Sequence, residues 1–259
     1  MIVVPVFAAP QAGVRHWARA FASMLLWHAS SLRVWAVTTI VVEIMAGCGM
    51  VIGVGLLVPD ISQTAALYCT TGTAVITLIM VGLIIGPQFI AQQRTDGTYE
   101  YLLGLPVPRT AAAFAWYTVC LVLALPGAVA ALALGCWHYD LSLRVSPAVV
   151  PAVLLASFTA TMLGYAVANA IERPMVTVIL TQVFIFLAFG YAPINFPPDQ
   201  MPHWLAEANR GLPFLPMATA VRHGLTPGFD NRLAESYAVL IAWAVGSALV
   251  AAIAIGRRR

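Results

Sequence analysis

The chain has 259 residues, of which 61% are hydrophobic and only 9% are charged, and its formal net charge is +3. A soluble domain of this length carries about 25% charged residues, so the composition excludes an ordinary soluble protein and predicts an all-α integral membrane protein. All 13 basic residues are arginine, and the absence of lysine excludes a Walker A phosphate loop, whose GxxxxGK motif requires that residue.

Residues 1–33 form an N-terminal segment, in which Val14 to Arg33 has the pattern of an amphipathic helix. Two arginines lie one helical turn apart, and apolar or aromatic residues recur at three- and four-residue spacing: Arg15 and Arg19 against Trp17, Phe21, Met24, Leu25, His28 and Leu32. A helix of this kind lies in the membrane interface. The alternative is a cytoplasmic extension of the membrane helix that follows.

Residues 34–259 are expected to form the membrane domain, with six apolar spans at about 34–57, 65–86, 111–137, 148–170, 175–192 and 234–256. Spans of about 20 residues cross the hydrocarbon layer, and the fifth is at the short end of that range. Six spans place both termini on one side, together with nine of the 13 arginines. The positive-inside rule therefore predicts a multi-pass protein of the cell membrane with cytoplasmic N- and C-termini.

The most polar stretch between spans runs from Pro87 to Arg109, after the second span. Gly97 is expected to end one helix and Thr98 to cap a new short one, with Glu100 in its first turn complementing the positive end of the helix dipole. Further residues give apolar contact and a polar rim: Tyr99, Tyr101 and Leu102, with Arg94 and Asp96. This composition suits a protein interface, and an ordinary solvated loop is the alternative.

The segment between the fifth and sixth spans, Pro193 to Leu233, is too apolar for an exposed loop and contains seven prolines. We expect two short helices in it, over Pro202 to Gly211 and Met217 to Leu225, that dip into the outer leaflet and return. Backbone at that depth has to pack on protein or line a cavity.

Several residues within the spans or just after the fifth span are further candidates for a functional or packing role. Glu43 lies near mid-membrane, where a charge is costly. It either contacts a substrate cation or gates the path, or it is protonated or paired with a Thr, Gln182 or an Arg and holds helices together. Gln182, Asn195 and Phe196 are further candidates for the substrate path. Gly49 with Gly53, and Gly82 with Gly86, form GxxxG pairs that allow close helix packing. The histidines and cysteines have no metal-ligand spacing, so no metal site is expected.

Two stretches of the sequence resemble parts of a known protein family. The run from Gln93 to Leu103, with Pro106 and Arg109, resembles the E-R-x-x-G-T-x-E-x-L-x-x-x-P-x-x-R pattern of ABC-2 type transporter permeases. The acidic residue usual at the first position of that pattern is Gln93 here. The second stretch, Ala192 to Pro197 with Pro202 to Leu205, Leu212 to Met217 and Arg222, looks like the re-entrant segment before the last helix of that family.

The resemblance implies a non-catalytic membrane subunit of an ABC exporter. Arg94 to Leu103 would be a coupling helix that docks on a separate ATPase subunit, which would bind ATP and Mg while this chain binds no cofactor. The chain would work in the lipid bilayer as a dimer with a second permease copy or paralogue, and no nucleic-acid partner is expected.

The substrate expected first is a hydrophobic or amphipathic drug or antibiotic, with a lipid- or polysaccharide-linked molecule as an alternative. Another class, a proton-coupled secondary transporter using Glu43, lacks the support of an inverted repeat. An intramembrane enzyme is a third class, for which no nucleophile–base pair or metal motif is visible in the sequence.

Overall fold

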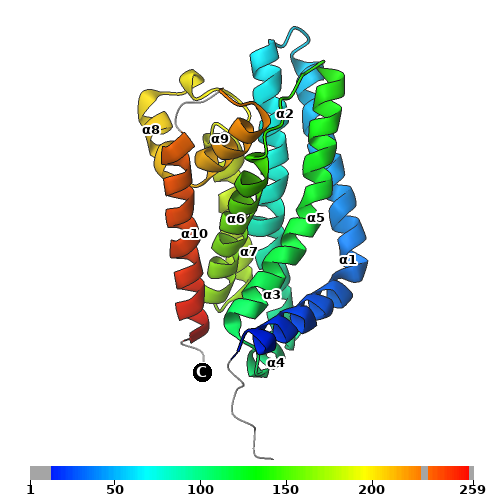
Figure 1. The fold of residues 1–259 in the computed structure, drawn as a ribbon, viewed down its shortest axis with the longest axis vertical. Helices are drawn as coiled ribbons and strands as arrows, with labels where there is room; N and C mark the ends of the chain where they lie inside the picture. Colours follow the sequence, from blue (N-terminus) through cyan, green and yellow to red (C-terminus); the bar gives the residue numbers. More distant parts are fainter. Residues whose placement is uncertain (1–12, 229–232, 257–259) are drawn as a thin grey trace, which may run out of the picture.

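The computed structural model describes residues 13–228 and 233–256, and within these ranges its regular structure is entirely helical (Figure 1). Six of its helices are long and apolar enough to cross a membrane, which confirms the predicted fold class. The elements are α1 (Val14–Leu57), α2 (Gln63–Ile79), η1 (Met80–Ile85), α3 (Gly86–Thr95), α4 (Thr98–Gly104), α5 (Arg109–His138), α6 (Val149–Ala170), α7 (Pro174–Phe186), η2 (Leu187–Tyr191), η3 (Pro198–Gln200), α8 (His203–Gly211), α9 (Phe214–Leu225) and α10 (Leu233–Gly256).

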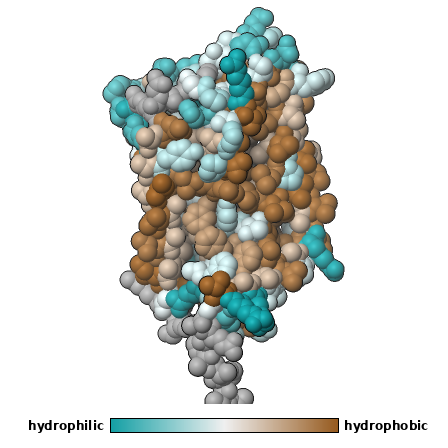
Figure 2. Space-filling view, viewed as in Figure 1, coloured by the Kyte–Doolittle hydropathy of each residue, from teal (hydrophilic) through white to brown (hydrophobic). Residues whose placement is uncertain are grey.

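The second membrane helix, formed by α2, η1 and α3, is the centre of the bundle. The most apolar part of this helix is 78% buried, whereas the corresponding parts of the first and fifth membrane helices are 17% buried. α1 packs along α5, and α10 packs along α6. The exposed surface forms an apolar band between two polar ends (Figure 2), as expected for a protein surrounded by lipid.

α1 joins the predicted interfacial helix to the predicted first span. The sequence predicts a boundary near Arg33, but one helix runs unbroken from Val14 to Leu57. Figure 1 shows its first part crossing the lower end of the bundle at an angle before the helix turns to run along α5. The structure therefore has a feature of each alternative. The segment continues into the membrane helix without a break, as an extension would, but it lies at an angle to that helix, as an interfacial helix would.

The second membrane helix is longer than predicted and ends at Thr95 rather than near residue 86. Pro87 lacks a backbone N–H, and its ring conflicts with the carbonyl group four residues earlier in a regular α-helix. Here the wider turns of η1 precede the proline, and the Gly86 N–H bonds to the carbonyl of Val81. The π-helical segment lets the helix pass the proline and continue through Arg94 to Thr95. The other four spans differ from their predicted limits by at most two residues.

The two helices predicted between the fifth and sixth spans are present as α8 and α9, at the end of the bundle opposite α4 (Figure 1). α9 is buried along most of its length. Its Arg222 is 2% exposed, donates to the hydroxyl of Thr71 (3.0 Å) and the carbonyl of Ile194 (2.6 Å), and stacks over the ring of Tyr68. The arginine therefore ties α9 to α2 and to the chain segment that follows η2.

The end of the bundle that carries α4 also holds the beginning of α5 and the last turn of α10 (Figure 1). The assignment of this end to the cytoplasm remains a prediction from the arginine distribution. Arg232 and the three terminal arginines, which contributed to that prediction, lie outside the described residues.

Candidate functional site

The polar segment between the second and third membrane helices forms a separate short helix, α4, at one end of the bundle. α3 ends at Thr95, and Gly97 has φ +72°, a left-handed conformation that strains other residues. α4 then begins at Thr98 without any side-chain cap. The expectation that Thr98 caps the helix is therefore wrong, because the position before α4 is occupied by Gly97 and Thr98 is already helical.

Tyr99 is turned into the bundle rather than outward. Its side chain is 6% exposed, and its hydroxyl donates to Oδ1 of Asn169, near the end of α6, at 2.6 Å. Asn169 in turn donates from Nδ2 to the carbonyl of Tyr165 (2.7 Å). Tyr99 was expected to offer apolar contact to a partner protein, and its burial corrects that expectation. It attaches α4 to α6 instead.

Arg94 reinforces this attachment. Its guanidinium lies 4.3 Å from the centre of the Tyr99 ring and donates a hydrogen bond to the carbonyl of Ile171, just after α6. Arg94 was expected at the rim of a protein interface, but it is half-buried within the chain. The outward surface is formed by other members of the predicted set. Asp96, Gly97 and Glu100 are exposed, and the neighbouring Tyr101 is 63% exposed.

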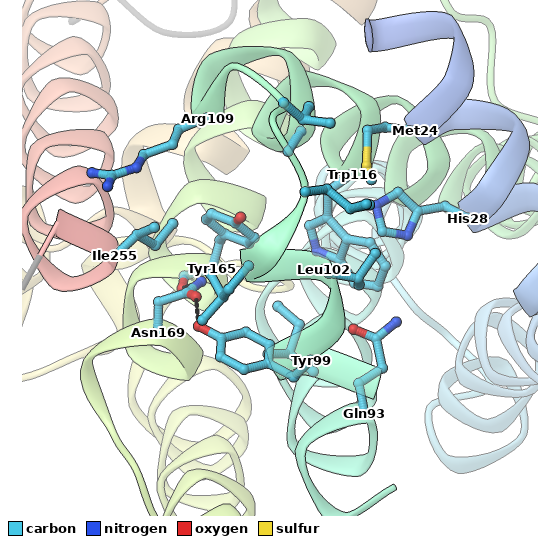
Figure 3. Close-up of a pocket in the computed structure, with 15 residues that line it drawn as sticks. Met24, His28, Gln93, Tyr99, Leu102, Arg109, Trp116, Tyr165, Asn169 and Ile255 are labelled. Atoms are coloured by element: carbon cyan, nitrogen blue, oxygen red, sulfur yellow. Dashed lines mark hydrogen bonds between the residues drawn. The ribbon is translucent and has the colours of Figure 1, made fainter. Parts of the chain in front are cut away.

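A cavity of about 120 Å³ lies behind α4, bounded by α1, α3, α5, α6 and α10 (Figure 3). Leu102, which was expected to face a partner, is half-buried and lines this cavity. Gln93, the residue in place of the family's usual acid, also lines it, as do His28 and Trp116. The cavity could not be predicted from local sequence, because its walls come from segments more than 200 residues apart.

The first part of α1 contributes Met24 and His28 to the cavity wall. Trp17 donates from Nε1 to the hydroxyl of Thr110 at the beginning of α5 (2.9 Å). The rings of His28 and Trp116 pack edge to face with centroids 5.0 Å apart. These contacts hold the N-terminal helix beside the beginning of α5 and behind α4.

Glu43 lies in the interface between α1 and α5. It is 1% exposed, and a Cβ atom added at Gly127 of α5 would lie 2.8 Å from the Glu43 Cβ. Neither carboxylate oxygen has a hydrogen-bond partner among the described residues. The hypothesis that Glu43 pairs with Gln182 is wrong for this conformation, because Gln182 is exposed on α7, which packs against α3.

The other candidates for the substrate path lie near α9. Asn195 Oδ1 approaches Gly72 of α2 closely, and Phe196 follows it as a half-buried residue. Asn195 adjoins Ile194, whose carbonyl accepts the hydrogen bond from Arg222. The structure thus places Asn195 and Phe196 together, whereas Glu43 and Gln182 lie on other elements.

The two glycine pairs have different surroundings. A Cβ atom on Gly82 would lie 2.8 Å from the backbone of Thr161 in α6, and one on Gly86 would lie 3.5 Å from Trp116 Nε1. Gly49 and Gly53 have nothing within 4 Å of such an atom. Gly82 therefore lies at a tight contact within the chain, and the Gly49 face of α1 is open.

A family model described as "ABC-2 family transporter protein" matches residues 38–253. A comparison with curated proteins finds no match. The matched range extends from the membrane-spanning part of α1 to α10 and includes α4, α9 and the cavity walls other than the first part of α1 and Ile255 of α10. The chain therefore belongs to the ABC-2 transporter family, whose members are membrane permeases of ABC transporters.

Proposed function

We propose that this chain is the permease subunit of an ABC exporter and that α4 is the helix on which a separate ATPase subunit docks. The observation that carries this proposal is that one side of α4 is packed against the bundle while the other side is exposed. Tyr99 is hydrogen-bonded to Asn169 within the bundle, while Glu100 and Tyr101 of the same helix are exposed, as is Asp96 just before it. A helix fixed on one side and open on the other suits a contact that transmits force.

The proposed route from α4 into the membrane is α6. Tyr99 and Arg94 join α4 to the last residues of α6 and to Ile171. At the opposite end of α6, a Cβ atom on Gly224 of α9 would lie 2.5 Å from Val149, and the Ser146 N–H bonds to the Gly224 carbonyl at 2.8 Å. A shift of α4 along this helix would therefore reach α9. A packed helix transmits such a displacement because protein interiors are dense and compress little.

Transport itself is proposed to occur between two permease copies, identical or paralogous. The substrate proposed first is a hydrophobic or amphipathic drug or antibiotic. The apolar character of the segment from Pro193 to Leu233 supports such a molecule over a highly charged one. ATP and Mg would be bound by the partner subunit.

Photo-cross-linking tests the docking side. Benzoylphenylalanine replaces Tyr101 in one variant. In the control it replaces Tyr191, the last residue of η2, which has a similar exposure (55% against 63%). After illumination of membranes containing the ATPase subunit, the Tyr101 variant should form a permease–ATPase adduct and the Tyr191 variant should not. Adducts from both positions, or from Tyr191 alone, would contradict the proposal.

A further inference from the structure

The first part of α1, residues 14–33, has a buried face and an exposed face. On one face every fourth residue is buried: Ala20, Met24, His28 and Leu32. On the other face, residues at three- and four-residue spacing are exposed: Arg15, Arg19, Ala22, Leu26, Ala29 and Arg33. Because an α-helix has about 3.6 residues per turn, residues at this spacing share one side of the helix. The arginines therefore lie on the side that faces away from the bundle.

The exposed face is positively charged, and the surrounding sequence has no acid to balance it. Residues 1–42 contain three arginines and no aspartate or glutamate. Among the described residues none of these arginines forms an ion pair, and the ion pairs present there join His203 and Arg210 to Glu207 in α8. The guanidinium groups of Arg15, Arg19 and Arg33 are therefore available to a partner outside the described chain.

The position of this face limits what that partner is. The first part of α1 crosses the end of the bundle where the apolar band gives way to polar surface (Figures 1 and 2). Leu26, which lies between the arginines on the same face, is 71% exposed. Arginines beside an exposed apolar side chain at this depth meet phosphate groups and the beginnings of acyl chains. The face thus has the chemistry of a phospholipid contact.

We propose that this face of α1 selectively binds anionic phospholipids, such as phosphatidylglycerol. A guanidinium group donates two parallel hydrogen bonds to a phosphate. Phosphatidylcholine also has a phosphate, but its own ammonium group balances that charge, so arginines near the bilayer surface favour a lipid with net negative charge. The bound lipid would hold the first part of α1 between the bilayer surface and α5, to which the hydrogen bond from Trp17 to Thr110 attaches it.

This lipid contact does not depend on the docking of an ATPase at α4. Lipid selectivity is measured on the purified chain without an ATPase, so its absence leaves the docking proposal untouched. A failure of the Tyr101 cross-linking experiment likewise leaves the lipid proposal in place.

Photo-cross-linking identifies the lipid at this face. Benzoylphenylalanine replaces the exposed Ala22 in the full chain, in nanodiscs with equal amounts of phosphatidylcholine and phosphatidylglycerol. Mass spectrometry of the adducts gives the ratio of the two lipids. Phosphatidylglycerol should be enriched about threefold or more over the bulk ratio, because each nearby arginine favours an anionic lipid. The same probe at Leu57, which is 82% exposed at the other end of α1, should show no enrichment.

Charge variants of the chain with the Ala22 probe test the arginines themselves. Arg15→Gln combined with Arg19→Gln should bring the lipid ratio to within about 1.5-fold of the bulk ratio, because two of the three charges are lost. Arg15→Lys combined with Arg19→Lys keeps both charges and should keep most of the enrichment. Arg144→Gln, at an exposed arginine beyond the other end of α5, should leave it unchanged.

Salt provides a test without changing the arginines, which keeps the proposal testable if the variants do not fold. At 1 M salt the Debye length is about 3 Å, so the enrichment at Ala22 should fall. The proposal is overturned if phosphatidylglycerol is not enriched at Ala22, or if the enrichment survives the loss of Arg15 and Arg19. It is also overturned if, in membranes containing the ATPase subunit, the Ala22 probe forms adducts mainly with that subunit.

Discussion

The hydroxyl of Tyr99 and Oδ1 of Asn169 lie 2.6 Å apart, across 70 residues of sequence, and both side chains are buried. This hydrogen bond joins the short helix between the second and third membrane helices to the end of α6. Within the described chain it is reinforced by Arg94, which packs on the tyrosine ring and bonds to Ile171. The contact makes α4 part of the bundle.

Removing the Tyr99 hydroxyl should destabilise the protein. Tyr99→Phe leaves Asn169 Oδ1 buried without its donor, which costs about 1–3 kcal/mol. Thermal unfolding in detergent should show a lower midpoint for Tyr99→Phe and for Asn169→Ala, and the double variant should lose less than the sum of the two. Tyr101→Phe, at the exposed tyrosine of the same helix, is the control. Strictly additive losses would mean that the two residues do not interact.

The approach of α1 to α5 should be sensitive to one added methyl group. An alanine at Gly127 would place its Cβ 2.8 Å from the Cβ of Glu43 and 3.0 Å from its backbone. Overpacking of this kind costs about 1–3 kcal/mol, so Gly127→Ala should unfold at a lower temperature. Gly246→Ala in α10, where nothing lies within 4 Å of the new atom, should not. Equal midpoints for the two variants would argue against this close contact.

Glu43 is expected to act as a packing residue rather than as a charged group on the transport path. Its carboxylate lies in the α1–α5 interface without a partner among the described residues, and an unpaired buried charge is costly. Glu43→Gln keeps the shape without the charge, so expression, thermal stability and transport rate should match the parent within about twofold. A transport rate reduced tenfold or more at normal expression would assign Glu43 a functional role.

Arg222 should not be replaceable by lysine. Its planar guanidinium bonds to Thr71 and to Ile194 while it stacks on Tyr68, and an ammonium group cannot reproduce this geometry. Arg222→Lys should make the α8–α9 region more susceptible to limited proteolysis and lower the unfolding temperature. Arg144→Lys, at an exposed position, provides the comparison. Identical cleavage patterns would show that Arg222 does not hold α9.

The membrane helices could be predicted from the sequence because hydropathy alone marks them, and four of the six end within two residues of their predicted limits. The errors lie where a helix continues without an apolar pattern. α3 passes Pro87 because η1 widens the preceding turns, and α1 continues through Arg33 as a single α-helix. Neither feature has a signature in local composition.

The direction of side chains in the candidate site could not be predicted. The sequence predicts an interface role for Tyr99 and Tyr101 alike, yet Tyr99 is buried and Tyr101 is exposed. The choice is made by Asn169 and Arg94, and the Asn169 contact is far from Tyr99 in sequence. The same holds for Glu43, whose neighbour Gly127 lies on another membrane helix.

The central claim, that α4 couples an ATPase to the membrane helices, is tested most directly by substrate-stimulated ATP hydrolysis in proteoliposomes containing both subunits. Gly97→Val strains a residue at φ +72° by about 1–2 kcal/mol, and Glu100→Arg reverses an exposed charge on α4. Gly104→Ala, at an exposed glycine with open space around it, is the control. We predict that Gly97→Val and Glu100→Arg each keep basal hydrolysis but lose the stimulation by substrate, while Gly104→Ala keeps both. Full stimulation in both Gly97→Val and Glu100→Arg would contradict the claim.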